Sequence, residues 1–197
     1  MKTFVLKQKA KASTKKEISQ KNMSIETPIY ELISKEDSFE IRSYSDMIIA
    51  KTNVQSDYKG STSTGFRRIA SYIFGGNYKE MKIAMTAPVI AECPSKDLSS
   101  YTVSFVMPKE HSLGGLPKAN TELVSIEQEN LGVVAVLSFG GWATDARSIS
   151  YQKKLSEILE NKKIKAQGGY MVAQFNSPWA LPMFRKNELM VKIKNNK

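Results

Sequence analysis

The sequence predicts an α+β domain in which a curved antiparallel sheet wraps into an open or distorted β-barrel, with two α-helices packed on its outside. Three observations predict this fold. Short strand-like runs dominate the chain, two amphipathic helical patterns interrupt them, and the links between them are short. The predicted order is three strands, a helix, four strands, a second helix and two strands.

The first half begins with three predicted strands. Residues 29–34 and 39–44 alternate in polarity around turn residues 35–38, which indicates a β-hairpin, and residues 47–54 predict a third strand. A helix follows, because apolar residues recur at helical spacing and form one stripe: Phe66, Ile69, Ala70, Ile73 and Phe74. The pair Gly75–Gly76 ends it, since glycine readily adopts the left-handed cap conformation.

The second half contains six predicted strands around a second helix. The strands are residues 82–91 (interrupted by Pro88), 101–107, 122–128, 131–139, 170–175 and 188–193. Residues 122–128 and 131–139 are predicted to form a hairpin that turns at Glu129–Asn130. Thr144–Asp145 can cap the helix. Its apolar face comprises Tyr151, Leu155, Ile158 and Leu159.

Charge is unevenly distributed along the chain. The net charge is +10, but residues 1–24 hold seven lysines against one acidic residue. We expect residues 1–24 to be a basic, disordered N-terminal tail and residues 25–195 to form one mildly basic domain. A nucleic-acid-binding domain concentrates its charge on a folded face. No specific nucleic-acid partner is therefore predicted.

Several classes of protein do not fit the sequence. The chain has no apolar run near the roughly 20 residues that a membrane-spanning helix needs, so integral membrane association is not predicted. Cys93 is the only cysteine, which excludes an intrachain disulfide and favours a reducing compartment. We expect a monomeric, cytoplasmic protein. The common nucleophile-elbow, P-loop and dinucleotide-binding patterns are missing, so no enzymatic activity is predicted.

Five segments, in order, resemble one family. They are Glu40–Tyr44 (EIRSY), Lys82–Val89 (KIAMTAPV), Tyr101–Pro108 (YTVSFVMP), Ser138–Ala143 (SFGGWA) and Arg185–Leu189 (RKNEL). The chain resembles the SOUL/haem-binding proteins from about Glu26 to Ile193. The resemblance implies a barrel of two four-stranded antiparallel sheets with two helices. It also implies non-covalent binding of haem b or a related tetrapyrrole in an exposed apolar groove.

The chain departs from that family at positions to which the resemblance assigns haem contacts. Ser43 stands where one branch has a histidine as proposed axial ligand, and serine is a poor ligand for haem iron. Where another branch has basic side chains near the propionates, this chain has Ser63, Ser71 and Leu181. Arg67 and Arg68 are close by and could substitute, since guanidinium groups bind carboxylates in a bidentate manner.

Two further residues are candidate iron ligands. His111 is the only histidine and lies in a Gly/Pro-rich loop, so it is either an axial ligand or an exposed surface residue. Cys93 precedes a proline and is either a thiolate ligand or a loop cysteine before a turn. A single histidine excludes bis-histidine ligation within one chain.

Segment 178–184 is too apolar for an ordinary exposed loop. It either folds back onto the core or forms the wall of a ligand groove beside the first helix. The candidate tetrapyrrole-binding residues are Phe66, Arg67, Ala70, Ile73, Trp179, Leu181 and Met183. A haem-modifying or other hydrolytic enzyme is one hypothesis, but the sequence offers no nucleophile for it. Of the other two hypotheses, the first is that the protein binds haem reversibly for buffering, transport or sensing. The second is that it is a protein-interaction or other small-ligand module that keeps the fold and has lost haem binding.

Overall fold

The computed structural model describes residues 25–93, 99–177 and 179–194, and the predicted tail, residues 1–24, lies outside them. In chain order, the described elements are β1 (Tyr30–Glu36), β2 (Phe39–Tyr44), β3 (Met47–Gln55), α2 (Tyr58–Ile73), β4 (Val89–Cys93), β5 (Ser100–Val106), β6 (Ser125–Glu129), β7 (Gly132–Gly140), α3 (Asp145–Asn161), β8 (Ala166–Gln174), the short 3-10 helix Pro182–Phe184, and β9 (Lys186–Ile193).

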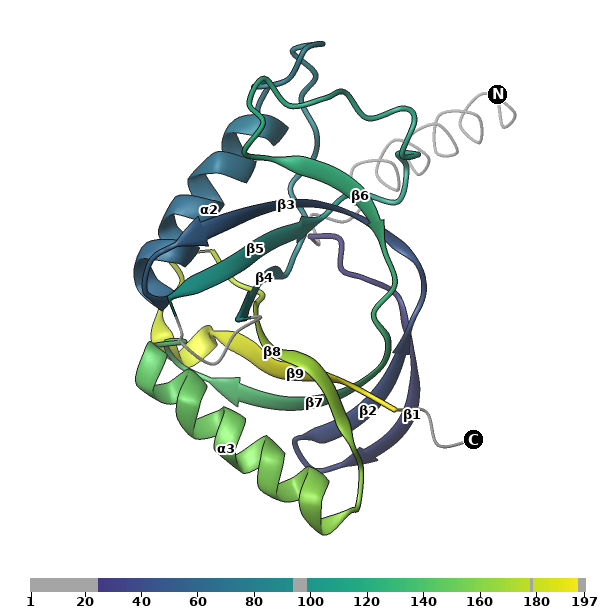
Figure 1. Ribbon diagram of the computed structural model, residues 1–197, viewed down its shortest axis with the longest axis vertical. Coiled ribbons are helices and arrows are strands. Elements are labelled where there is room, and N and C mark those ends of the chain that lie inside the picture. Colours follow the sequence, from purple (N-terminus) through teal and green to yellow (C-terminus); the bar gives the residue numbers. More distant parts are fainter. Residues whose placement is uncertain (1–24, 94–98, 178, 195–197) are drawn as a thin grey trace, which may run out of the picture.

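The strands pair into one antiparallel sheet in the order β1-β2-β7-β9-β8-β4-β5-β3-β6. The sheet curls into a barrel that stays open, because β1 and β6 are its two edges within the described chain (Figure 1). The predicted α+β fold with a distorted barrel and two helices is confirmed. It consists, however, of a single nine-stranded sheet rather than two four-stranded sheets.

Strand pairing agrees with the sequence for the first hairpin only. β1 and β2 pair as predicted. The second predicted hairpin, within residues 122–139, is wrong, because β6 pairs with β3 at the sheet edge whereas β7 lies between β2 and β9. Alternating polarity specifies which face a residue occupies, but it does not specify which strand lies alongside.

Both helices pack on the outer face of the sheet, α2 against β3 and β5, and α3 against β7, β8 and β9 (Figure 1). Asp57 caps α2 and Thr144 caps α3, each by accepting a backbone N–H of the first turn. Gly65 lets α2 approach β5 closely, since a Cβ at this position would lie 2.5 Å from Val103 Cβ. Neither helix in the described part of the chain is long and apolar enough to span a bilayer.

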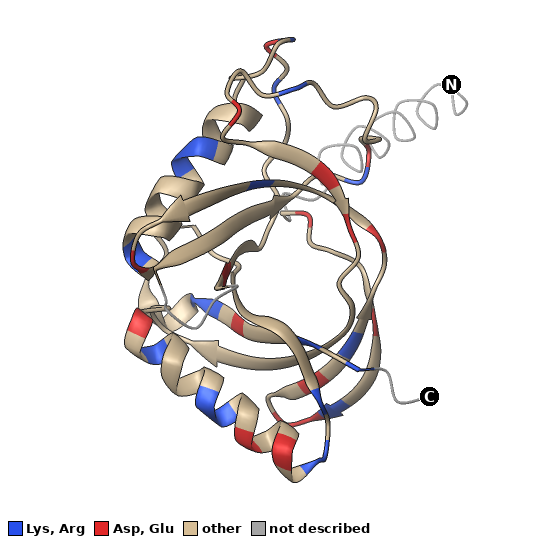
Figure 2. Ribbon diagram, in the orientation of Figure 1, with Lys and Arg blue, Asp and Glu red and all other residues tan. Residues whose placement is uncertain are grey.

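Two apolar cores lie on opposite faces of the sheet. The larger core lies between the helices and the outer face, and the helices contribute Tyr58, Ile69, Tyr72, Ile73, Leu155 and Leu159 to it. The smaller core lies inside the barrel and consists of Tyr44, Ile90, Leu131, Val134, Val136, Met171, Ala173 and Met190. Basic and acidic residues are interspersed along α3 and around the strands (Figure 2). Several of these charged residues share the inner face with the smaller core.

Candidate functional site

The main candidate site is a cleft of about 400 Å³ between α2 and the segment that joins β8 to β9. One wall is a single face of α2, because its residues recur at helical spacing: Lys59, Thr62, Ser63, Phe66 and Arg67. The rest of the lining comes from Val89 and Gln174, which pair in the sheet, and from Trp142, Ala143, Asn176 and Arg185. The volume is within the range typical of small-molecule sites.

The cleft carries three cations and no acidic side chain among the described residues that line it. Lys59 and Arg67 are exposed on the helix wall. Arg185 is only 6% exposed, donates from Nε to the Ala180 carbonyl at 2.9 Å, and lies 3.7 Å from the centroid of the Trp142 ring. This lining favours an anionic group on an otherwise apolar ligand.

Contacts with buried residues fix the side chains that line the cleft. The Phe66 ring is half-buried, with its centroid 5.5 Å from that of Phe105 in the larger core. Gln174 donates from Nε2 to the Tyr58 hydroxyl at 3.2 Å. Burial raises the pKa of Tyr58 to about 12, so this hydroxyl stays protonated at neutral pH. The wall formed by α2 is therefore fixed to the sheet on its inner side.

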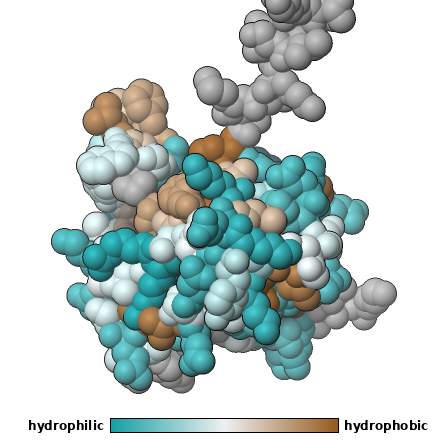
Figure 3. Space-filling model, turned by 90° about the horizontal axis from the view of Figure 1, so that it is seen from above, coloured by the Kyte–Doolittle hydropathy of each residue, from teal (hydrophilic) through white to brown (hydrophobic). Residues whose placement is uncertain are grey.

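The apolar loop between β8 and β9 stands out into solvent instead of folding back onto the core. Trp179 is 92% exposed, Leu181 58% and Met183 78%. Asn176 and Arg185 flank the loop and line the cleft, so the loop rises from the cleft's rim. The neighbouring Pro178 lies outside the described residues. Apolar side chains gather in separate patches on an otherwise mostly polar surface (Figure 3).

The predicted site residues on α2 divide into two groups. Phe66 and Arg67 line the cleft. Ala70 and Ile73 are 8% and 1% exposed and lie in the packed interior, so the structure does not bring them to the cleft. Ile73 is two turns beyond Phe66 on the same helix face, but its side chain is part of the larger core, and the Ile83 N–H donates to its backbone carbonyl at 2.8 Å.

The two candidate iron ligands lie away from the cleft lining. His111 lines a different pocket, of about 310 Å³, and its Nε2 is 3.7 Å from a Glu110 carboxylate oxygen. Cys93 ends β4 and is partly buried against the larger core. The described residues contain no cluster of three or more histidine, cysteine or acidic side chains that could hold a metal ion. Among the described residues that line the cleft, none is histidine, cysteine, methionine or tyrosine, the usual axial haem ligands.

Lys59, Trp142 and Arg185 also line the cleft, and none of them is among the residues predicted from the sequence. A signal for two of them was present, because Trp142 lies in the segment SFGGWA and Arg185 begins the segment RKNEL. Lys59 lies two turns before Phe66 on the same helix face. The helix pattern alone contained this information.

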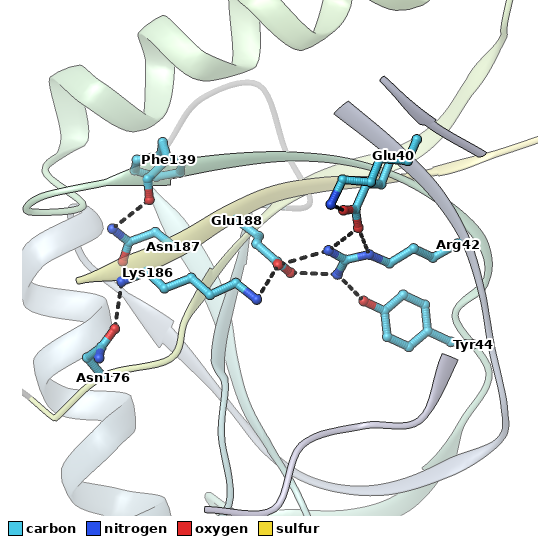
Figure 4. Close-up of polar contacts among 9 residues, drawn as sticks. Glu40, Arg42, Tyr44, Phe139, Asn176, Lys186, Asn187 and Glu188 are labelled. Carbon is cyan, nitrogen blue, oxygen red and sulfur yellow. Dashed lines mark hydrogen bonds and ion pairs between the residues drawn. The ribbon is translucent and has the colours of Figure 1, made fainter. Parts of the chain in front are cut away.

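A buried ion cluster inside the barrel was also missed (Figure 4). Arg42 is 2% exposed, and its guanidinium donates two hydrogen bonds to Glu188, at 2.8 and 3.0 Å. It also donates to Glu40 at 2.7 Å and to the Tyr44 hydroxyl at 3.0 Å. Glu188 is fully buried, and Lys186 Nζ approaches it to 3.0 Å. The sequence did contain a signal for this cluster, because two strand-like segments carry charged residues at every second position: Glu40 and Arg42 in one, Lys186 and Glu188 in the other.

This pairing sets the charge state of the cluster. Burial by itself would lower the pKa of Arg42, but its hydrogen bonds to Glu188 and Tyr44 outweigh burial and raise it. Burial would raise the pKa of Glu40, but hydrogen bonds from Lys35 and Arg42 outweigh it and lower that pKa. Burial raises the pKa of Tyr44, so its hydroxyl keeps its proton at neutral pH.

Comparisons with known proteins agree with the resemblance. The family described as SOUL heme-binding protein matches residues 25–192. The chain is 35% identical to "Heme-binding protein 2" of Homo sapiens, over 80% of this chain and 79% of the human protein, and 33% identical to its namesake in Mus musculus with the same coverage.

Solved structures share the fold at low sequence identity. The C-terminal domain of EcmrR superposes with a TM-score of 0.63 at 10% identity, covering 85% of this chain and 99% of that domain. A hydrolase from Listeria innocua superposes with a TM-score of 0.57 at 11% identity, covering 82% of this chain and 94% of that one. At such identities the likeness concerns the fold alone.

Proposed function

Since the chain belongs to the SOUL heme-binding protein family, we propose that it binds haem b or a related tetrapyrrole in the cleft between α2 and the β8–β9 loop. Binding is non-covalent and reversible, and it serves buffering, transport or sensing. The observation that carries the proposal is the cleft lining, in which the aromatic rings of Phe66 and Trp142 lie near the exposed cationic side chains of Lys59 and Arg67. A tetrapyrrole with propionate groups presents the complementary surface, a flat apolar body with carboxylates at one edge.

The residues divide the work by chemistry. Arg67 and Lys59 bind the propionates, replacing the basic positions that the family has elsewhere on this helix. Phe66 and Trp142 contact the porphyrin plane. The loop carries Trp179, Leu181 and Met183 from the rim over the outer face of the ligand. His111 and Cys93 take no part, because the cleft lining includes neither of them.

We propose a binding role without turnover, carried out by a monomer in the cytoplasm. The family's description as haem-binding supports the first point. The single cysteine, Cys93, fits a reducing compartment and supports the location.

The test is a hemin titration of the full chain followed by Soret absorbance. Wild type should bind hemin saturably and near-stoichiometrically, with as many hemin molecules bound as protein chains. Arg67→Glu should weaken binding about tenfold or more, since a hydrogen bond to a charged group contributes roughly 1.5–3 kcal/mol and the new carboxylate repels the propionate. Phe66→Ala and Trp142→Ala should also weaken binding.

Matched controls distinguish binding in the cleft from a general effect of surface charge and from axial ligation by His111 or Cys93. Lys153→Glu makes the same change of charge on an exposed position of α3 and should leave binding unchanged. His111→Ala and Cys93→Ala should keep the wild-type Soret band. A non-saturating response of the wild type would refute haem binding, and loss of the band in His111→Ala or Cys93→Ala would move the site away from the cleft.

A second candidate function is a protein-interaction module that keeps this fold without haem. The observation that favours it is the exposure of the loop, where Trp179 and Met183 are largely open to solvent. A failed hemin titration, together with a partner that binds wild type and loses affinity for Trp179→Ser, would support this function.

A further inference from the structure

A second cavity, of about 340 Å³, lies inside the barrel and shares no lining residue with the cleft. It is lined by inward-facing residues of β2, β4 and β9, with Leu131, Phe175 and the described start of the chain closing it. The two sites lie back to back across the sheet. Neighbouring residues face opposite sites in three places: Val89 and Ile90, Gln174 and Phe175, Arg185 and Lys186.

The cavity has one polar end and one apolar body. The polar end consists of Arg42, Tyr44 and Lys186, all members of the ion cluster or bonded to it. The apolar body includes Ile90, Leu131 and Met190 of the smaller core. A cavity with this division fits a ligand that is charged at one end and aliphatic along the rest.

The carboxylates of the buried ion cluster, Glu40 and Glu188, do not face the cavity. The five N–H groups of Arg42 point to Glu188, Glu40 and the Tyr44 hydroxyl. Neither Glu188 nor Glu40 lines the cavity, and Glu188 has no exposed surface. A cationic ligand would therefore find no carboxylate among the described residues that line the cavity.

Hydrogen-bond donors, by contrast, remain available at the polar end. Lys186 Nζ has three N–H groups, one of which is directed at Glu188 at 3.0 Å. Its side chain is 55% exposed, and Nζ lies 4.4 Å from the centroid of the Phe175 ring at the cavity wall, so the ammonium group is placed at the edge of the cavity. The Tyr44 hydroxyl accepts from Arg42, so within the described chain its own proton is free to be donated. Both donors suit a carboxylate.

We propose that the barrel interior binds an aliphatic monocarboxylate, with its carboxylate at Lys186 and Tyr44 and its chain along Ile90, Leu131 and Met190. Two segments of the family resemblance contribute to this cavity: Arg42 and Tyr44 come from Glu40–Tyr44, and Lys186 comes from Arg185–Leu189, whose first residue lines the cleft instead. This site is separate from the haem cleft and does not depend on it.

The test is calorimetric titration of the full chain with decanoate, a probe that has the proposed chemistry. Wild type should bind saturably at one equivalent. Lys186→Met should weaken binding about tenfold, because it removes a charge-assisted contact, and Tyr44→Phe should weaken it several-fold. Near-UV circular dichroism should show that both variants keep the wild-type fold.

Three comparisons make the test decisive. Lys153→Met removes a lysine on α3 and should not change decanoate affinity. Phe66→Ala should weaken hemin and leave decanoate unaffected, which separates failure of this site from failure of the haem cleft. Decylamine and decanol should bind at least tenfold more weakly than decanoate. Equal binding of decylamine, decanoate binding that neither Lys186→Met nor Tyr44→Phe reduces, or no saturable heat with wild type would each overturn the proposal.

Discussion

The buried ion cluster makes a sharp prediction for Arg42→Met. Methionine retains much of the apolar stem of arginine but none of its donors, so Glu188 loses two hydrogen bonds while remaining fully buried. Among the described residues, its one other charged contact is to Lys186, whose side chain is 55% exposed, so solvent partly screens this contact. Removing one partner of a buried ion pair costs about 3–5 kcal/mol. We expect a loss near the lower end, about 3 kcal/mol, because Lys186 still offsets part of the charge.

Urea denaturation measures this loss, and a double variant gives the control. Arg42→Met combined with Glu188→Met replaces both charges by apolar side chains, and such replacements are often neutral or stabilising. Glu40 then keeps Lys35 at 2.9 Å. The double variant should therefore be more stable than the single one by about 2 kcal/mol or more. A single variant within about 1 kcal/mol of wild type would contradict this cost of leaving Glu188 unpaired, and so would a double variant no more stable than the single one.

Two further predictions concern stability. Burial raises the pKa of Glu92, so the folded state holds its proton more tightly than the unfolded chain, and stability falls as pH rises through the window between the two pKa values. Glu92→Gln should therefore unfold at a higher temperature than wild type at pH 7, and this difference in unfolding temperature should disappear below about pH 4.5. A difference of the same size at pH 7 and below pH 4.5 would contradict this prediction. Gly65→Ala should lose about 1–2 kcal/mol in urea, because overpacking against Val103 outweighs the helix propensity of alanine. Adding Val103→Ala should reduce the effect of the Gly65 change, and a single variant more stable than wild type would show that the close contact is absent.

Local sequence patterns predicted the helices and strands themselves better than they predicted which strands lie side by side in the sheet. The stripe containing Ile69 and Ile73 predicted α2, and Thr144 predicted the start of α3, because both signals act within a few residues of the chain. The partner of β6 depends on contacts with distant residues, such as the ion pair between Lys51 and Glu127. Alternation in residues 122–139 fits either pairing equally well.

The candidate site shows the same division. Phe66 and Arg67 could be predicted because they belong to one helix. Trp142 and Arg185 meet them only after β7 and β9 have taken their places in the sheet. Ile73 shares the face of Phe66, but it is buried in the larger core, to which α2 is packed through β3 and β5 and to which Ile83 from the following chain also belongs. Periodicity reports a face of an element, and it does not report what later covers that face.

The back-to-back arrangement of cleft and cavity determines where this chain tolerates changes of length. Deleting Asn187 would place Lys186 and Glu188 on opposite faces of the sheet, so that these two side chains could no longer both face the barrel interior. Insertions between Asn176 and Arg185 would instead leave the pairing of Gln174 with Asn187 intact. The rim of the cleft is thus open to variation in length among related chains, whereas the strands that separate the two compartments are not.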